Sequence, residues 1–218
     1  MSLTPLFVKK IPHGNAVQRN ERQFARFENM HCWAHLLEHS QNRTKLSLGT
    51  LGSGNHFIEA YANGYIAVHT GSRNIGLAVA QYYQKLAEQN IDTFNNIELH
   101  RMLPSIPEKA RENWLKKSRI DVPRELCFLV GKDMANYLSD MCILQQFADA
   151  NRSIILETII HDMGGKIIDS IDSVHNHIDT DTMILRKGAI SAQKDEKLVI
   201  PLNMRDGLLI CVGKGNPE

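Results

Sequence analysis

Apolar residues recur every three or four positions in several stretches of the chain, a spacing that predicts helices with one apolar face. The longest stretch covers residues 125–163, and the Gly164-Gly165 pair that follows supplies a stop signal. At about 1.5 Å per residue such a helix would be roughly 50 Å long. Residues 92–107 are less regular. The other predicted helices cover residues 20–39, 75–90 and 108–119.

Short runs rich in β-branched and aromatic residues flank this helical region and predict strands. Before it, residues 46–69 read as a strand, a glycine turn and a strand, and Asn63-Gly64 predicts a two-residue hairpin turn. After Lys166 the pattern changes to short strands, beginning with KIIDSID. We therefore predict an α+β fold: a mixed or antiparallel sheet core with a long helical insertion over about residues 75–164, in a single domain over residues 1–218.

Two histidines lie next to glycine-rich turns at the ends of predicted strands. His56 follows the glycines of LGTLGSGNHFIE, and His69 precedes those of HTGSRNIG. These glycines match neither of the common nucleotide-binding fingerprints, GxxxxGK[ST] and GxGxxG. Counted from the Asn63-Gly64 turn, the two hairpin arms that carry the histidines are nearly equal in length, so both imidazoles should lie at the same end of the hairpin. We predict that their ring nitrogens lie within about 5 Å of each other, with His175 nearby, as a shared ligand site requires.

A second group of histidines leaves two interpretations open. His31, His35 and His39 fall at i, i+4 and i+8 of a predicted helix and would share one face. That spacing suits a metal site, but no carboxylate or loop ligand accompanies it, and a solvated helix face is the simpler explanation.

The composition limits the classes of function. Lys and Arg number 25 and Asp and Glu 24, for a net charge of +1, so any RNA binding would have to come from local basic patches. No run of 18 apolar residues and no signal peptide is visible, so we expect no membrane association. Widely spaced cysteines without a CxxC pair favour a reducing cytoplasm over a disulfide framework. These are Cys32, Cys127, Cys142 and Cys211.

The two glycine and histidine stretches resemble the RtcB family of RNA ligases, which join RNA ends using GTP and manganese. The resemblance recurs in order along the chain, from about residue 12 to 216, at Asn151-Arg152, His175-Asn176, Arg186-Lys187-Gly188-Ala189 and Gly213-Lys214-Gly215-Asn216. It implies an RtcB-like fold of which this chain is the central portion. The family's upstream Asp and Cys metal-ligand motif and its downstream His-Gly-Ala-Gly-Arg nucleophile loop are not found here, so we expect an inactive fragment, incomplete at both ends, with no catalytic residue of its own.

The resemblance also implies a set of binding residues. The metal ligands for two Mn²⁺ ions would be His56 and His69 on one ion and His175 on the other. Contacts to substrate phosphate would come from Arg73, Asn151, Arg152, Arg186 and Lys187. The GTP site would be formed by Asn55, His56, Phe57, Ile58, Glu59, His175, Asn176, Pro201, Leu202, Asn203 and Met204. Glu59 would accept hydrogen bonds from guanine, while Leu202 and Asn203 depart from the family's usual Gly-Ser.

The function implied is GTP- and Mn²⁺-dependent joining of RNA 3′-phosphate or 2′,3′-cyclic phosphate ends to 5′-hydroxyl ends, in tRNA splicing or RNA repair. The partners would be tRNA or rRNA ends and an archease-type activator, in the cytoplasm. Two alternatives remain. A metal-dependent phosphoesterase would act without GTP. A non-catalytic remnant would bind RNA or a partner and keep the fold without the chemistry.

Overall fold

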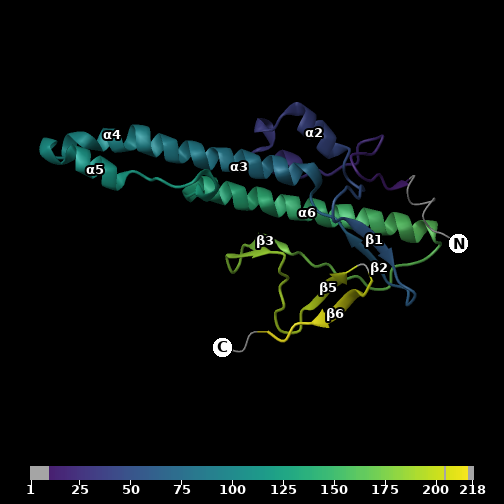
Figure 1. The fold of residues 1–218 in the computed structure, drawn as a ribbon. Coiled ribbons are helices and arrows are strands. Elements are labelled where there is room, and N and C mark those ends of the chain that lie inside the picture. Colours follow the sequence, from purple (N-terminus) through teal and green to yellow (C-terminus); the bar gives the residue numbers. More distant parts are fainter. Residues whose placement is uncertain (1–9, 204, 216–218) are drawn as a thin grey trace. The chain divides into compact units, whose positions relative to one another are not determined.

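The computed structural model describes residues 10–203 and 205–215, and Figure 1 shows its helices and strands, most of them labelled. Long helices occur together with small antiparallel sheets, which confirms the predicted α+β class with a long helix. Contacts divide the chain into two compact units, and the assignment of a single domain stays a prediction. The first unit comprises Met1–Arg22, Leu46–Gly71 and Gln145–Glu218. The second unit comprises Gln23–Lys45 and Ser72–Leu144.

The predicted hairpin is present in the first unit. Strands β1 (Phe57–Ala60) and β2 (Ile66–His69) pair antiparallel, with Phe57 opposite His69. His56 directly precedes β1, so both histidines lie at the same end of the hairpin, as the lengths of its arms predicted.

The loop of this hairpin is longer than the sequence suggested. The backbone N–H of Tyr61 donates to the carbonyl of Tyr65 at 2.8 Å, and these two residues enclose Ala62, Asn63 and Gly64. Gly64 adopts a φ of +90°, a left-handed conformation that glycine tolerates better than other residues.

Two further hairpins complete the described strands. β3 (Asn176–Asp179) pairs with β4 (Ile184–Lys187), and β5 (Lys197–Asn203) pairs with β6 (Gly207–Val212). The described strands thus form three separate two-stranded antiparallel sheets. The strand predicted at residues 166–172 is absent from this part of the chain, because the segment pairs with no other strand.

Helix α6 (Gly131–Asp162) is the long helix, with 32 residues. Figure 1 shows it as one continuous element. It begins six residues later than the sequence predicted. Its end is the predicted glycine stop: Gly164 has a φ of +66°, and the N–H of Gly165 donates to the carbonyl of Ile160 at 3.0 Å.

The core of the first unit packs against one face of α6. Ile155 and Ile159, one turn apart on the helix, cluster with Ile11, and all three side chains are at least 95% buried. Apolar side chains of the β1–β2 hairpin and its glycine turn cover this cluster: Leu51, Ile58, Ile66 and Val68.

The second unit is helical. Helix α3 (Arg73–Thr93) extends the predicted helix at 75–90, and its buried stripe has a spacing of four residues. The stripe consists of Ile75, Val79, Tyr83, Ala87 and Ile91. The remaining elements are η1 (Phe27–Asn29), η2 (Trp33–His35), α2 (Glu38–Lys45), η3 (Phe94–Glu98), α4 (Leu99–Met102), η4 (Leu103–Ser105), η5 (Glu108–Ala110), α5 (Arg111–Ser118) and η6 (Arg124–Leu126).

Much of the stretch at 92–107 is helical, although its pattern looked irregular. The π-helical turn η3 carries Asn95, which is 4% exposed. Its side-chain amide donates to the carbonyl of Ile120 and its amide oxygen accepts from the N–H of Ile120, at 2.7 and 2.9 Å. These two hydrogen bonds stabilise the turn, and the spacing of apolar residues does not predict them because Ile120 lies 25 residues away.

The helix predicted at 20–39 is wrong. Within residues 20–37, all of which the structure describes, only short 3₁₀ turns form before α2 begins at Glu38. The reason is Asp140, a fully buried residue of α6, whose carboxylate accepts the backbone N–H groups of His31 and Cys32 at 2.7 and 3.0 Å. Those donors are then not available for α-helical bonds. His31, His35 and His39 therefore share no helix face, and the metal site considered for them has no basis.

Candidate metal and nucleotide site

Two of the three predicted metal ligands face each other in the first unit. His69 ends β2, His175 directly precedes β3, and their Nε2 atoms are 3.2 Å apart. Two nitrogens that bind one ion at about 2.1 Å each, at a right angle or a tetrahedral angle, lie about 3.0–3.4 Å from each other. The imidazole pair therefore has the spacing of two ligands on one ion.

A backbone carbonyl orients His69. Its Nδ1 lies 3.0 Å from the carbonyl oxygen of Asn55. Because a carbonyl only accepts, Nδ1 carries the proton and donates, and the lone pair on Nε2 is directed towards His175. Ligating histidines in metalloproteins are held in this way.

The surroundings also keep His69 neutral. Burial lowers the pKa of His69, and the neighbouring His175 and Arg152 lower this pKa further, against the opposing effect of the hydrogen bond to Asn55. A neutral imidazole is the form that binds a metal cation. The local electrostatics therefore favour the ligand form of His69 near pH 7.

His56 lies beside this pair. Its ring centroid is 5.9 Å from that of His69, and the two rings meet edge to face at 75°. Within residues 10–203 and 205–215, no group of three or more His, Cys, Asp or Glu side chains is placed to hold a metal ion. The ring nitrogens that approach each other are those of His69 and His175, whereas the resemblance placed His69 with His56 on one ion. The ligand role of all three histidines stays a prediction.

Asn151 holds the glycine-rich turn that leads to His56. Its Oδ1 accepts the N–H groups of Gly49 and Thr50 at 2.6 and 3.0 Å, and its Nδ2 donates to the carbonyl of Thr50 at 3.0 Å. The side chain is fully buried. The structure thus gives Asn151 a role in positioning the turn, and the phosphate contact that the resemblance implied stays a prediction.

Arg152 makes a two-pronged ion pair with Asp172. Its Nε and Nη2 each donate to one carboxylate oxygen of Asp172 at 2.8 Å, and its Nη1 donates to the carbonyl of Thr70 at 3.3 Å. Thr70 follows His69 directly, so the guanidinium connects the end of β2 to the loop before β3. A substrate phosphate would have to compete with Asp172 for this side chain.

The two segments predicted to bind nucleotide approach each other through Tyr61. The Tyr61 hydroxyl donates to Glu59 on β1, and burial together with this bond raises the pKa of Tyr61 to about 12. A Cβ atom added to Gly207 would lie 3.1 Å from Cε1 of Tyr61, so the ring packs against that glycine. Gly207 pairs with Asn203 at the turn between β5 and β6. One ring therefore links Glu59 to the turn that carries Asn203.

The remaining residues of the first nucleotide segment have different surroundings. Asn55 is exposed, and the Phe57 ring lies 5.1 Å from the ring of His69. Ile58 packs on the core cluster, which is a structural role. On β3, Oδ1 of Asn176 accepts the N–H of Gly188 at 2.8 Å and so fastens the end of the β3–β4 hairpin.

The second nucleotide segment lies at the tip of the β5–β6 hairpin. Pro201, Leu202 and Asn203 are exposed there, while Met204 lies outside the described residues. The Asn203 side-chain oxygen accepts the backbone N–H groups of Arg205 and Asp206 at 2.9 and 2.8 Å. The residue that departs from the family's usual serine therefore stabilises the turn itself.

The other predicted phosphate contacts divide between the two units. Arg186 on β4 is 9% exposed and donates to Asp179 at 2.9 Å, whereas its neighbour Lys187 is exposed. Arg73 belongs to the second unit, where it begins α3 with a left-handed φ of +62°. Burial, followed by repulsion from Arg43, lowers the pKa of Arg73. Among the predicted phosphate contacts of the first unit, Lys187 is thus the exposed cation.

A protein-family model described as "tRNA-splicing ligase RtcB" matches residues 11–218. The chain belongs to the RtcB family. This match includes every residue assigned above to the metal, nucleotide and phosphate sites. The RtcB fold relationship rests on sequence, since no solved structure was found to match the chain.

Similar proteins carry RtcB names. RNA-splicing ligase RtcB1 and RNA-splicing ligase RtcB, both from Escherichia coli and the latter from strain K12, are each 27% identical over 95% of this chain and 55% of their own lengths. The tRNA-splicing ligase RtcB of Nanoarchaeum equitans is 33% identical over 53% of this chain and 23% of its own length. The chain thus spans about half the length of these Escherichia coli RtcB relatives. None of the described helices is both long and apolar enough to cross a membrane.

Two residues of this site were missed in the sequence analysis. Tyr61 follows the strand that carries Glu59, and Asp172 lies in the segment at 166–172 for which the sequence predicts a strand. Residues two positions apart in a strand lie on the same face of the sheet, so the sequence places Tyr61 beside Glu59. This spacing is the local pattern that could have indicated Tyr61. Asp172 gave no such signal, because its partner is 20 residues away on a helix.

Proposed function

We propose that the chain forms the metal- and nucleotide-binding part of a GTP- and Mn²⁺-dependent RNA ligase of the RtcB type. Such an enzyme joins RNA 3′-phosphate or 2′,3′-cyclic phosphate ends to 5′-hydroxyl ends. The observation that carries the proposal is the pair formed by His69 and His175, whose Nε2 atoms are 3.2 Å apart. Family membership and the RNA-ligase names of the relatives support the same function.

The residues present fit one Mn²⁺ ion as a partial site. His69 and His175 would supply two nitrogen ligands, with His69 held in the correct tautomer by the Asn55 carbonyl. Manganese also favours oxygen ligands, which water, phosphate or carboxylate groups provide. When bound, the ion supplies positive charge that stabilises and orients a phosphoryl group.

The residues of the chain would position the nucleotide and the RNA. Glu59, held by Tyr61, would accept hydrogen bonds from guanine. Lys187 is exposed on β4 and would offset RNA phosphate charge. Asn151 would act indirectly, by holding the glycine-rich turn whose continuation carries Asn55 and His56. The RNA would be a tRNA or rRNA end, with an archease-type activator as partner and the cytoplasm as location.

Manganese binding is the direct test of the imidazole pair. We expect electron paramagnetic resonance titration of the purified chain to show Mn²⁺ binding that His69→Ala or His175→Ala weakens at least tenfold. His100→Ala is the matched control, because His100 is an exposed histidine of α4 in the second unit. If both variants bind Mn²⁺ as the unaltered chain does, the proposed site is wrong.

Nucleotide selectivity tests the second half of the proposal. We expect calorimetry to show tighter binding of GTP than of ATP, and Glu59→Gln to remove most of that difference, because the amide offers only one acceptor atom. Glu157→Gln, at an exposed position of α6, is the control. Equal affinities for the two nucleotides in the unaltered chain would refute the assignment of Glu59 to guanine.

The alternatives make different predictions. A phosphoesterase would cleave RNA phosphate ends with Mn²⁺ and without GTP, and a binding remnant would retain RNA without responding to either. The absence of catalysis by this chain alone also stays a prediction. Its test is incubation with labelled GTP and Mn²⁺, in which a stable GMP adduct on the chain would contradict it.

A further inference from the structure

The outer edge of strand β6 lacks the features that keep strand edges apart. Within the part of the chain that the structure describes, β6 pairs with β5 alone. Proteins protect exposed edges with charged residues, proline or a covering segment, because unpaired N–H and C=O groups readily pair with another chain. β6 contains no charged residue and no proline. Three of its apolar side chains are at least 42% exposed: Leu209, Ile210 and Val212.

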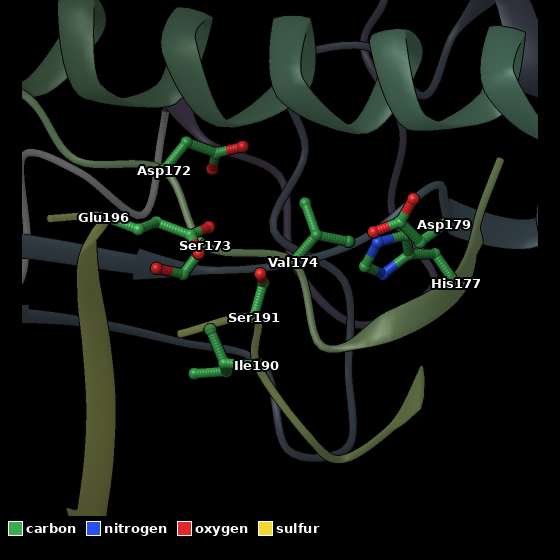
Figure 2. Close-up of a pocket in the computed structure, with 8 residues that line it drawn as sticks. All are labelled: Asp172, Ser173, Val174, His177, Asp179, Ile190, Ser191 and Glu196. Carbon is green, nitrogen blue, oxygen red and sulfur yellow. The ribbon is translucent and has the colours of Figure 1, made fainter. Parts of the chain in front are cut away.

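The outer edge of β5, in contrast, is protected in all three ways. Pro201 has no N–H to offer, and Lys197 places a charge at the start of the strand. The N–H of Val199 donates to Oγ of Ser173 at 3.0 Å. Ser173 and Glu196, the residue before β5, line the same cavity and lie on one side of it in Figure 2. The segment before β3 thus lies along β5, which leaves β6 as the open edge among the described residues.

The pairing within the hairpin shows which groups of β6 point outward. In an antiparallel pair, opposite residues alternate between pairs that exchange both hydrogen bonds and pairs that exchange none. Val199, whose N–H is taken by the segment before β3, is opposite Ile210, so this pair is of the second kind. The N–H and C=O of Ile210 therefore point away from β5, as do those of Leu208 and Val212. Pro201 lies opposite Leu208, which agrees with this assignment because proline has no N–H to give.

Two copies of β6 match each other when Ile210 lies on a two-fold axis. In that antiparallel register Ile210 is opposite its own copy, Leu208 is opposite Val212, and each of these pairs can exchange both backbone hydrogen bonds. Asp206 precedes Ile210 by four residues and Lys214 follows it by four, so these two exposed, oppositely charged residues also lie opposite each other. Any other register separates these charges.

We propose that the β6 edge is a homodimer interface, at which two copies of this chain join their β5–β6 hairpins into one continuous antiparallel sheet. The partner is a second copy because β6 is complementary to itself in hydrogen bonding, in apolar character and in the charges at its ends. The net charge of +1 adds little repulsion between copies. This inference goes beyond the proposed function and does not depend on it.

Sedimentation velocity of the full 218-residue chain tests the dimer. An interface of one strand pair is small, so we expect a dissociation constant on the order of 10 µM, with mostly monomer at about 1 µM and mostly dimer at about 100 µM. Ile210→Lys places like charges opposite each other on the two-fold axis and should raise this constant at least tenfold. Leu185→Lys, at a 72% exposed position of β4, is the matched control and should leave it unchanged. A chain that is monomeric at 100 µM overturns the proposal.

Ile210→Pro is a second variant that keeps the hairpin intact. It removes an outward N–H without removing a bond to β5, as Pro201 does on the other strand, and should also raise the dissociation constant at least tenfold. Circular dichroism confirms that both variants are folded. A dimer that persists in both folded variants would use a different surface and would overturn the β6 interface.

A charge exchange tests the register. Lys214→Glu replaces attraction to Asp206 of the second copy by repulsion, twice per dimer, and should weaken the dimer about tenfold. The effect is no larger because Asp206 also pairs with Arg205 of its own chain at 2.8 Å. Adding Asp206→Lys restores opposite charges and should return the dissociation constant to within about threefold of the unaltered value. A double variant that dimerises no better than Lys214→Glu alone would refute this register.

Amide hydrogen exchange, resolved residue by residue, gives a pattern specific to this edge. When the chain is concentrated from about 1 to 100 µM, the N–H groups of Leu208, Ile210 and Val212 should gain protection. Those of Leu209 and Cys211, which face β5, should be protected at both concentrations. A gain of protection that does not alternate along β6 would contradict strand pairing at this edge.

Discussion

Replacing Asn151 with alanine removes three hydrogen bonds from the interior of the first unit, and we expect a large loss of stability. A buried intramolecular hydrogen bond contributes about 0.5–1.5 kcal/mol net, so three sum to about 1.5–4.5 kcal/mol. The partners are N–H and C=O groups of Gly49 and Thr50, both buried, and water cannot easily replace the lost amide. We therefore expect about 3 kcal/mol, near the middle of that range.

For a chain of this size, 1 kcal/mol shifts the melting temperature by about 2–4 °C, so Asn151→Ala should melt about 6–12 °C lower. Circular dichroism at 222 nm measures this shift, and amide hydrogen exchange should show that the N–H groups of Gly49 and Thr50 lose protection. Ser153→Ala, an exposed position two residues along α6, is the control and should change the melting temperature by less than about 2 °C. A variant that melts like this control but binds RNA more weakly would refute the positioning role and restore the phosphate contact.

Three further changes test other parts of the structure. Gly207→Ala should lower the free energy of unfolding, measured in urea, by about 1 kcal/mol more than Gly64→Ala does. Both glycines have a positive φ, but only at Gly207 would the added Cβ contact Tyr61. Equal losses of stability in the two variants would contradict this packing. Ile155→Ala should lower the free energy of unfolding by about 2–5 kcal/mol in the same assay, because the Ile155 side chain is fully buried. A loss below about 1 kcal/mol would show that this side chain does not belong to the core. Backbone N–H groups and an arginine lower the pKa of Asp179 to about 2, so its contribution to stability is complete above the unfolded-state value of 3.8 and is lost as the pH falls towards 2. Asp179→Asn should therefore flatten the decline in stability between pH 4 and 2, and an unchanged pH profile would show that the carboxylate is not held in this way.

Local patterns predicted the elements that depend on local information. The period of α6 persists over its whole length, and a glycine pair ends it, so both its existence and its end could be foreseen. The stretch at 20–39 carried a similar period but does not form that helix. The carboxylate that takes its backbone donors belongs to Asp140, 109 residues from His31, and no local pattern contains that partner.

The residues of the candidate site also differ in whether a local pattern or a distant partner determines their position. The arms of the β1–β2 hairpin indicated that His56 and His69 lie at one end, because a hairpin register follows from its turn. The close approach of His175 to His69 spans 106 residues and depends on how the β3 segment packs. The resemblance indicates Asn151 and Arg152, but no local pattern indicates their hydrogen-bond partners. Polar side chains on a helix bond to whatever backbone or carboxylate the tertiary structure places beside them.

The orientation of His69 depends on an atom that side-chain mutagenesis does not reach. The oxygen that accepts its Nδ1–H belongs to the peptide group between Asn55 and His56, and every amino acid at position 55 would supply the same oxygen. An alanine scan would therefore pass over this contact, and position 55 is free to vary in evolution without changing which imidazole nitrogen carries the proton. Only an alteration of the main chain itself, such as a thioamide in place of that peptide group or a shift in the preceding glycine turn, would expose how much the imidazole pair depends on it.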